Sequence, residues 1–559
     1  MRKQIFLHPS SLILHPFPVT SLRSLLVVAF LLVCCVATAA PKVTCTFDDN
    51  GLASLSYGDV QFIKSGAPRV SNVLFSDDKG GEVSADKTSP TISFDRIAQR
   101  YSYSLPWGAV RCRYQLTGNR LNVELTLEND TAGPMSGVEL DLMELQFPRR
   151  PAGTPWEKRF QMISDNDGDI TAQVADYKTG VLTFCDDDPT SAIRAGFSPG
   201  AAPPAETWLL RVTSPQPTGP KPAVFVEPRS TKTFHFSIRF TEPGVPLKEI
   251  AGDIIDKFVT AHPFQLKWPD RRPIGMFSLA SGAHSSPTNP RGWFGEPKDD
   301  FVGKNGIKHF REKVFEVADR AIGILKSMGA QGMIFWDMEG EEYSNINFVG
   351  DPRMTATLAP EMEAVAPELF ERFHKAGLRT GVCIRPSRIV PGWDGKSKWQ
   401  HSHMGFDVVE EMNQKIIYAR KHLGCLLFYV DTNVRYFNTP DGKVDSRLLE
   451  GAAFKKLADA HPDILLIPEI PRLEYWSCTA PYQELRPHFF GNHAATDPRV
   501  LEFYPRAFSL INPIDGPAKE RRAELVAGQR RGDTLLFRCW FPDEQNLLFK
   551  SILDEAKRR

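Results

Sequence analysis

Two short apolar runs in the second half of the sequence each end in a carboxylate. One runs from Cys425 to Asp431, and the other runs from Ile464 to Glu469. Runs of this length and apolarity are typical of buried parallel strands. Two carboxyl groups at neighbouring strand ends can divide the roles of acid and base, because like charges raise the pKa of one of them. Cleavage of a glycosidic bond needs that division.

The elements that would position these carboxylates alternate between strand and helix from residue 272 onwards. The expected strands cover residues 274–279, 332–337, 380–385, 425–431, 464–469, a region near 482–486, 507–512 and 534–540. Helical periodicity predicts helices between them, including 314–328, 362–376 and 408–423. This repeat predicts a (β/α)8 TIM barrel, in which active-site residues lie where the strands end. No glycine-rich phosphate loop follows the first strand, which disfavours a dinucleotide-binding fold.

Further candidates for the site stand at or after the ends of the other strands. Arg385 can bind an acidic sugar through its donors, or it can form an ion pair with Asp337 or Asp431. The aromatic residues could stack on a sugar or pack in the core. Asp431 could start a turn and Glu469 could end a strand in a salt bridge, but together at one barrel face they favour catalysis. The candidate substrate-binding residues are Asp337, Glu339, Arg385, Trp336, Tyr429, Trp476 and Asp515.

The N-terminus has the pattern of an export signal. An unbroken apolar run from Leu25 to Val36 follows Arg23 and precedes a stretch of small residues. Such a run is typical of a signal peptide and is too short to span a membrane. We expect residues 1–40 to be removed, with cleavage after Ala39 or Ala40, and the protein to be periplasmic or secreted.

The sequence between this signal and the barrel predicts an antiparallel β-sandwich over residues 41–245. Residues 110–116 and 121–127 alternate with period two around Gly118 and Asn119, which predicts a hairpin. Turn residues recur and no long amphipathic helix interrupts the pattern, as in sandwich domains. A linker helix is expected within residues 246–271, and the barrel then covers residues 272–559.

Charge and cysteine spacing exclude several classes of function. The 67 Lys and Arg residues balance the 67 Asp and Glu residues, which disfavours a nucleic-acid partner. The cysteines beyond the signal lack CxxC spacing, so neither a metal nor a cofactor is expected. Cys383, Cys425 and Cys539 lie in apolar strands and should be small core residues. Cys45 and Cys112 are a possible disulfide.

The layout of a β-sandwich followed by a barrel in an exported protein resembles barrel glycoside hydrolases. Asp431 after the fourth strand is similar in position to the nucleophile of the α-galactosidase and α-glucosidase clans. Carboxylates after strands four, five and seven, here Asp431, Glu469 and Asp515, look like the α-amylase clan. Tyr429 stands where these clans have Arg or Lys. The resemblance implies Asp431 as nucleophile and Glu469 as general acid and base.

These patterns predict an exported glycoside hydrolase that acts on an oligosaccharide or polysaccharide. The alternative is a non-catalytic carbohydrate-binding or cell-surface protein on the same architecture, which would keep the aromatic loops without two facing carboxylates. We expect no membrane association after the signal is removed. The sugar, the linkage and the oligomeric state are left open.

Overall fold

The computed structural model describes most of the chain beyond the predicted signal peptide. The described residues are 42–76, 82–84, 89–146, 160–163, 172–177, 180–188, 193–199, 207–214, 224–296, 298–340, 349–392, 398–438, 443–486 and 493–558. The predicted signal and its cleavage sites lie outside these residues. Within them, no helix is both long enough and apolar enough to cross a membrane.

The N-terminal part consists of antiparallel strands, as the alternating pattern predicted. The strands are β1 (Val43–Phe47), β2 (Leu52–Tyr57), β3 (Val60–Gln61), β4 (Ile63–Ser65), β5 (Arg69–Ser76), β6 (Glu82–Ser84), β7 (Thr91–Asp95), β8 (Arg100–Leu105), β9 (Gly108–Thr117), β10 (Arg120–Asn129), β11 (Met135–Gln146), β12 (Phe160–Ile163), β13 (Ala172–Tyr177), β14 (Gly180–Asp186), β15 (Arg194–Pro199), β16 (Thr207–Thr213) and β17 (Ser230–Thr241).

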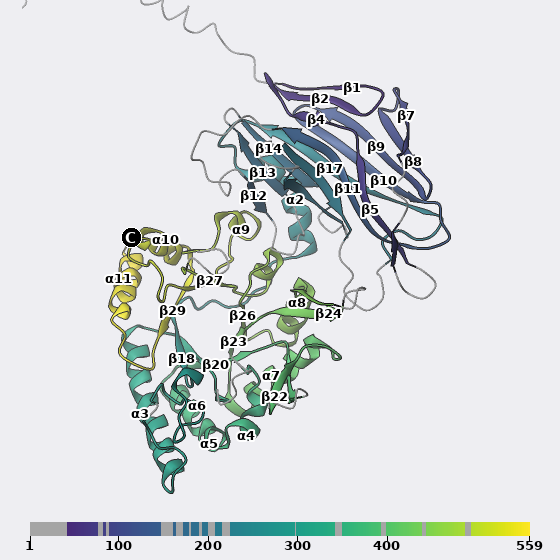
Figure 1. Ribbon diagram of the computed structural model, residues 1–559. Coiled ribbons are helices and arrows are strands. Elements are labelled where there is room, and N and C mark those ends of the chain that lie inside the picture. Colours follow the sequence, from purple (N-terminus) through teal and green to yellow (C-terminus); the bar gives the residue numbers. More distant parts are fainter. Residues whose placement is uncertain are drawn as a thin grey trace, which may run out of the picture. The chain divides into compact units, whose positions relative to one another are not determined.

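These strands form two large sheets and a small one (Figure 1). The eight-stranded sheet has the order β12-β13-β14-β17-β10-β9-β8-β7, and the six-stranded sheet has the order β15-β16-β11-β5-β6 with β4 paired to β11. Buried side chains from both large sheets, such as Leu125 of β10 and Leu140 of β11, belong to one core. The arrangement is the predicted sandwich.

The predicted hairpin is confirmed as the pair β9–β10. Leu121 pairs with Leu116 across the turn, and Gly118 has a φ of 58°. That left-handed conformation favours glycine and permits the tight reversal. The alternating residues of β10 are buried on one face, which fixes its register in the sheet.

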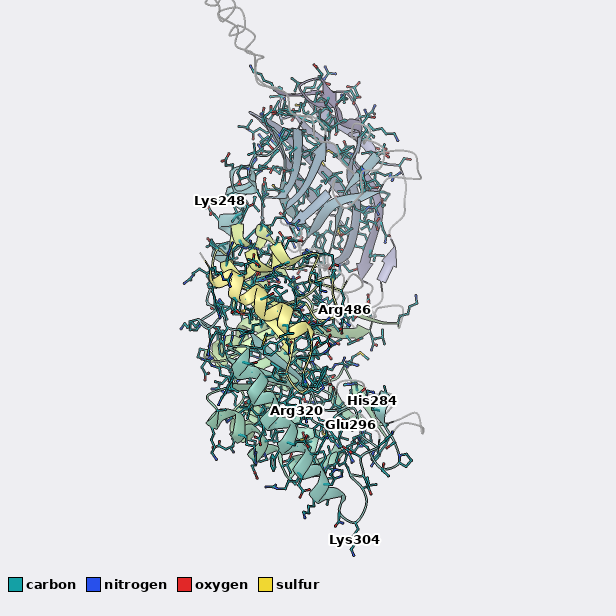
Figure 2. The ribbon with its side chains drawn as sticks, turned by 90° about the vertical axis from the view of Figure 1, so that its left-hand side faces the viewer. Lys248, His284, Glu296, Lys304, Arg320 and Arg486 are labelled. Atoms are coloured by element: carbon teal, nitrogen blue, oxygen red, sulfur yellow. The ribbon has the colours of Figure 1, made fainter. Side chains whose placement is uncertain are left out.

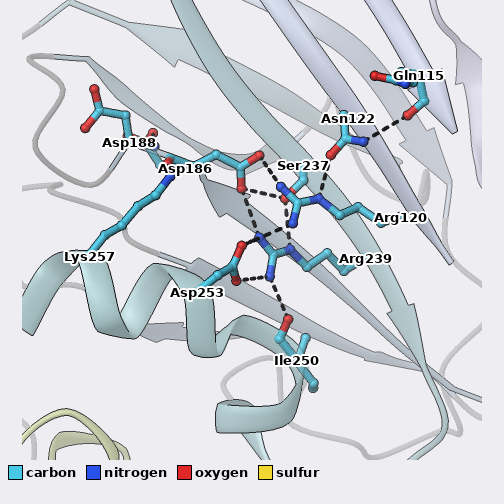
Figure 3. A network of polar contacts seen from close by, with 11 residues as sticks. Gln115, Arg120, Asn122, Asp186, Asp188, Ser237, Arg239, Ile250, Asp253 and Lys257 are labelled. Carbon is cyan, nitrogen blue, oxygen red and sulfur yellow. Dashed lines mark hydrogen bonds and ion pairs between the residues drawn. The ribbon is translucent and has the colours of Figure 1, made fainter. Parts of the chain in front are cut away.

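A buried arginine joins the sandwich to the helix that follows it. Helix α2 (Leu247–Ala261) lies within residues 246–271, where a helix was expected. Arg239 on β17 bonds Asp253 of α2 at 2.5 Å and Asp187 at 3.0 Å, and it donates to the carbonyl of Ile250 at 2.8 Å. Figure 3 shows the guanidinium of Arg239 between the strand and the helix. Arg120 pairs with the same two carboxylates, so two cations balance two anions, and Arg239 also bonds a helix carbonyl.

Eight parallel strands follow α2 and confirm the predicted barrel. They are β18 (Ile274–Ser278), β19 (Gly332–Trp336), β20 (Arg379–Ile384), β23 (Leu427–Val430), β26 (Leu465–Pro468), β27 (Tyr482–Glu484), β28 (Leu510–Asn512) and β29 (Thr534–Arg538). Their order is β26-β23-β20-β19-β18-β29-β28-β27, with all neighbours parallel. The poorly defined sixth strand is β27, and the two carboxylate-tipped runs are the fourth and fifth strands.

Helices cover the outside of this sheet. They are α3 (Gly306–Ser327), α4 (Thr355–Leu358), α5 (Pro360–Glu363), α6 (Ala366–Lys375), α7 (Val408–Leu423), α8 (Gly451–Ala460), α9 (Pro498–Phe503), α10 (Arg522–Arg531) and α11 (Gln545–Lys557). Two short hairpin pairs, β21–β22 (Arg388–Pro391, Trp399–Ser402) and β24–β25 (Val434–Asn438, Val444–Leu448), lie in the loops. Arg320 lies on the solvent side of α3, opposite its buried face (Figure 2).

One helix prediction was wrong in its extent. The pattern over 362–376 predicted a single helix, but the structure has α5 and α6 with a break between them. Pro367 lies in the first turn of α6, where its missing N–H costs nothing. The apolar period continues across the break, so periodicity alone did not reveal it.

The described cysteines are all free thiols. Cys383, Cys425 and Cys539 are buried, as predicted for core residues. Cys45 and Cys112 do not form the disulfide that was considered: Cys112 is buried in the sandwich core and Cys45 packs against that core.

We predict that Arg239→Met lowers the free energy of unfolding by about 3 kcal/mol, because it removes the buried cation and leaves Asp187 and Asp253 paired with the more exposed Arg120. Urea denaturation would measure this change. The matched control is Arg100→Met, which removes an exposed ion pair with Asp95 at 3.7 Å and should change stability by less than about 1 kcal/mol. Equal effects of the two substitutions would contradict the structural role of Arg239.

Candidate active site

The barrel interior changes from apolar to polar at the carboxyl ends of the strands. Cys383, Tyr429, Ile467 and Tyr482 belong to one buried interior cluster. Side chains two positions apart in a strand share a face, so the residues two positions further on point the same way. Those residues are Arg385, Asp431, Glu469 and Glu484.

The strand ladder extends far enough to hold two of these residues in register. The backbone N–H of Asp431 donates to the carbonyl of Ile384 at 2.9 Å, and that of Glu469 donates to the carbonyl of Val430 at 3.0 Å. Both carboxylates therefore lie on strand ends that are bonded to their neighbours. Asp431 is only 6% exposed.

Three aromatic rings form the floor beneath this polar layer. The rings of Trp336 and Tyr429 lie 5.1 Å apart, and those of Tyr429 and Tyr482 lie 5.4 Å apart at nearly a right angle. Burial, followed by the charge of Glu469, raises the pKa of Tyr429 well above its ordinary value. The two candidate aromatics Trp336 and Tyr429 thus lie directly below the carboxylates.

Arg385 forms an ion pair with Asp431, which was one of the two roles considered for it. Its Nε bonds Oδ2 of Asp431 at 2.5 Å, and its Nη2 donates to Oγ1 of Thr432 at 3.1 Å. The Thr432 hydroxyl in turn donates to Oδ1 of Asp431 at 3.1 Å. Both oxygens of Asp431 are therefore held by hydrogen bonds, one of them charge-assisted.

Glu469 differs in electrostatics from Asp431. Its Oε2 accepts a hydrogen bond from the backbone N–H of Thr432 at 2.7 Å. Burial, then the charge of Asp431 and a hydrogen bond with that carboxylate, raise the pKa of Glu469 to about 7. The site thus contains one carboxylate beside a cation and one carboxyl group that holds a proton up to neutral pH.

The turn after the fourth strand is strained. Thr432 has a φ of 47°, which is uncommon for a β-branched residue. This conformation directs its N–H toward Glu469 and its hydroxyl toward Asp431. Such strain is concentrated at functional sites, because the surrounding structure must hold it in place.

The acidic segment after the second strand adds two buried carboxylates. Asp337 has a φ of 60° and is 5% exposed. Glu339 is also buried, and its Oε1 accepts the backbone N–H of Asp351 at 2.8 Å. Burial is the main cause that raises the pKa of Glu339 to about 7. Asp337, Glu339, Arg385 and Asp431 all act electrostatically on the thiol of Cys383, which places them around one strand end.

Two sequence candidates lie apart from this cluster. Trp476 packs with α2 and α9 in a separate apolar cluster, and its indole N–H donates to Ser509 at 3.1 Å. Asp515 follows the seventh strand, is half exposed, and pairs with Arg538. Within the described part of the chain, neither side chain hydrogen-bonds or pairs with Asp431 or Glu469. Trp293, from the long loop after the first strand, is fully buried and packs on Phe310.

Histidines from the loop after the third strand reach the site. His401 lies 3.4 Å from Nη1 of Arg385 and 2.9 Å from Oγ of Ser387. Its ring stacks on His403, which packs on Tyr436. Burial, then the charge of Arg385, lower the pKa of His401 to about 3, so this ring is neutral at ordinary pH.

Thr432 and Glu484 also lie at the site and were not predicted from the sequence. Glu484 ends the sixth strand, pairs with Arg486, and accepts a hydrogen bond from the Tyr482 hydroxyl at 3.1 Å. The sequence did contain one indication of Glu484, because it stands two residues after the interior residue Tyr482. The strand has only three residues, so this alternation was hard to recognise.

No group of three or more His, Cys, Asp or Glu suited to a metal is found within the described ranges.

We predict that Asp431→Asn lowers the pKa of Glu469, because the like charge of Asp431 raises it. Titration of ¹³C-labelled carboxyl groups by NMR would measure the shift without any substrate. Glu339 is the internal control, because its pKa is raised to about 7 mainly by burial and Asp431 is not among the causes. An unchanged pKa of Glu469 in the variant would contradict the electrostatic coupling of the two carboxyl groups.

No protein-family model and no curated protein matches the sequence. Among solved structures, a GH31 family sulfoquinovosidase from E. rectale in complex with an aza-sugar inhibitor overlaps at a TM-score of 0.46 and 9% identity, covering 92% of this chain and 82% of that one. An alpha-galactosidase from Lactobacillus brevis overlaps at a TM-score of 0.38 and 11% identity, covering 93% of this chain and 72% of that one. A cycloalternan-forming enzyme from Listeria monocytogenes overlaps at a TM-score of 0.38 and 8% identity, covering 93% of this chain and 54% of that one. The chain is similar to these sugar-processing enzymes in general layout, while its fold assignment rests on its own sheet topology.

Proposed function

We propose that the chain is an exported glycoside hydrolase that cleaves an oligosaccharide or polysaccharide, with Asp431 as nucleophile and Glu469 as general acid and base. One arrangement supports the proposal: an ion-paired carboxylate beside a partly buried carboxyl group whose pKa is raised to about 7. Glycosidic cleavage requires these two protonation states together. The apolar run from Leu25 to Val36 supports export.

In the first step, Glu469 gives its proton to the glycosidic oxygen while Asp431 attacks the anomeric carbon. The bond between that carbon and the oxygen breaks, the leaving sugar departs as an alcohol, and Asp431 carries the glycosyl group. In the second step, ionised Glu469 takes a proton from water, whose oxygen attacks the anomeric carbon and releases Asp431. Each cycle consumes one water and restores both carboxyl groups.

The contact between the two carboxyl groups favours this retaining route. Inverting enzymes separate their carboxyl groups by roughly 6.5–9.5 Å to admit a water, whereas retaining enzymes keep them about 5 Å apart. The charge of Asp431 and a hydrogen bond with it both raise the pKa of Glu469, so the two carboxyl groups lie closer together than the wide separation of inverting enzymes. The substrate would part this pair as the glycosidic bond enters.

The remaining neighbours fit supporting roles. Trp336, Tyr429 and Tyr482 supply an aromatic floor that can contact the apolar face of a sugar ring. Asp337 and Glu339 offer carboxylate oxygens to sugar hydroxyls. Arg385 already bonds Asp431, Thr432 and His401, so its role in the proposal is to hold the nucleophile rather than to bind an acidic sugar.

We expect Asp431→Asn to lower kcat/KM on glycosides by roughly 10³-fold or more, because the nucleophile is lost. Release of sugar from aryl glycosides and polysaccharides would measure this effect. With Asp431→Ala, added azide should restore turnover of an aryl glycoside and yield a glycosyl azide. Asp445→Asn, on an exposed strand, is the surface control. Equal sugar release by wild type and the Asn variant would exclude Asp431 as nucleophile, and the absence of hydrolysis and of azide products would favour a binding protein.

We expect kcat/KM to fall above a pH of about 7, because Glu469 must be protonated to act as the acid. Glu469→Gln should remove this alkaline limb and lower kcat/KM by about 10²- to 10⁴-fold. The loss should be smaller for substrates whose leaving group needs no proton. A limb near pH 7 that persists in the Gln variant would assign it to another group.

A further inference from the structure

Lys415 is a fully buried ammonium behind the active site. It lies on α7, and its side chain is 0% exposed. Its Nζ donates to the carbonyls of Ser387 at 2.6 Å, Arg385 at 2.9 Å and Gly350 at 3.1 Å. These contacts use all three N–H donors of the ammonium. The balancing charge is Asp351, whose Oδ2 lies 3.5 Å away.

The three carbonyls meet at one junction of the backbone. The carbonyl of Gly350 accepts both the Lys415 ammonium and the backbone N–H of Arg385, the latter at 2.9 Å. Gly350 has a φ of 57°, and a Cβ there would lie 2.9 Å from the nitrogen of Arg385. Only glycine allows the segment after the second strand to approach the end of the third strand this closely.

Arg385 and Ser387, which follow the third strand and are held by Lys415, are linked through side chains to Asp431. Arg385 bonds Asp431 directly. Ser387 contacts Nδ1 of His401, and Nε2 of His401 faces Nη1 of Arg385. A guanidinium can only donate, so Nε2 accepts and Nδ1 carries the hydrogen that is donated to Ser387. The orientation of the guanidinium therefore depends on the backbone positions of residues 385 and 387.

The charge partner is itself held in place. Asp351 accepts two bonds from the side chain of Arg353, at 2.8 and 2.7 Å, and Arg353 also pairs with Glu411 of α7. Lys415 and Glu411 lie one turn apart on the same buried face. An apolar side chain in place of Lys415 would leave three carbonyls without this donor, so filling of the core does not explain a lysine here.

We propose that Lys415 is a positioning residue for the reaction at Asp431: its ammonium fixes the backbone of Arg385 and Ser387 and thereby aims the Arg385 guanidinium at the nucleophile. The kinetic consequences rest on the proposed glycoside hydrolysis, whereas the positioning itself does not. Misplacement of a reacting group by about 1 Å from a distant substitution can cost about 10²-fold in rate.

The test compares Lys415→Met with Lys421→Met, which changes an exposed lysine on the same helix. The first readout is the pKa of Glu469, followed by ¹³C-carboxyl NMR without substrate. The charge of Arg385 lowers this pKa, so a displaced guanidinium should let it rise above about 7 in Lys415→Met and leave it unchanged in Lys421→Met. The second readout is turnover of an aryl glycoside, where kcat should fall about 10- to 100-fold with KM nearly constant.

The outcomes separate the two proposals. A folded Lys415→Met with unchanged Glu469 titration and unchanged kcat would overturn the positioning role, whatever its loss of stability. A shifted Glu469 titration in a protein that hydrolyses no glycoside would support positioning and contradict the proposed function. Should the Met variant fail to fold, Lys415→Gln keeps two N–H donors, and a smaller shift in the same direction is expected from it. An unshifted titration in a folded Gln variant would also overturn the proposal.

Discussion

The ion pair between Arg385 and Asp431 is the interaction on which the site depends. It joins the ends of the adjacent third and fourth strands and holds one oxygen of the Asp431 carboxylate. Burial, and then the charge of Asp431 and a hydrogen bond with it, raise the pKa of its neighbour Glu469 to about 7. The two carboxyl groups thus have different surroundings, since Arg385 bonds Asp431 directly.

Placing that cation requires buried charge on the outer side of the strands. The ammonium of Lys415 and the carboxylates of Asp351 and Glu411 lie between α7 and the strand ends, together with Arg353. Burying such groups is costly unless each is paired and hydrogen-bonded, and here each has partners. An apolar interface would pack α7 against the barrel equally well. The polar one adds directional bonds, which define backbone positions more narrowly than apolar contacts do.

Much of the architecture was predictable because it depends on periodicity. Strand and helix alternate with clear hydrophobic patterns, so the eight strands and the neighbouring positions of Asp431 and Glu469 followed from counting. The break at Pro367 was hidden by an apolar period that continues across it. In the N-terminal part, period-two alternation was sufficient to predict the hairpin β9–β10. It did not predict which distant strands pair, because that pairing depends on side-chain contacts between sheets.

The site itself was only partly predictable. Burial of Trp476 against α2 and α9 depends on tertiary packing that no local pattern encodes. Lys415 and Glu411 were overlooked because charged residues on a helix usually face solvent, yet both share the face of Met412 and Ile416, which the apolar period had marked. The left-handed backbone of Thr432 could not be predicted from its residue type, since β-branched residues avoid this conformation.

The sheet order also distinguishes the positions of the two candidate catalytic carboxylates. The described strands form a continuous ladder from β26 around to β27, and those two strands are its ends. Near this seam, the N–H of Ala480 bonds the carbonyl of Leu466 at 3.0 Å. Asp431 stands on a strand bonded on both sides, whereas Glu469 stands on the strand beside the seam. Under the proposed function, the nucleophile stands on a strand between two paired neighbours, and the proton donor stands at the end of the continuous ladder, where the Ala480 bond provides a link to the next segment.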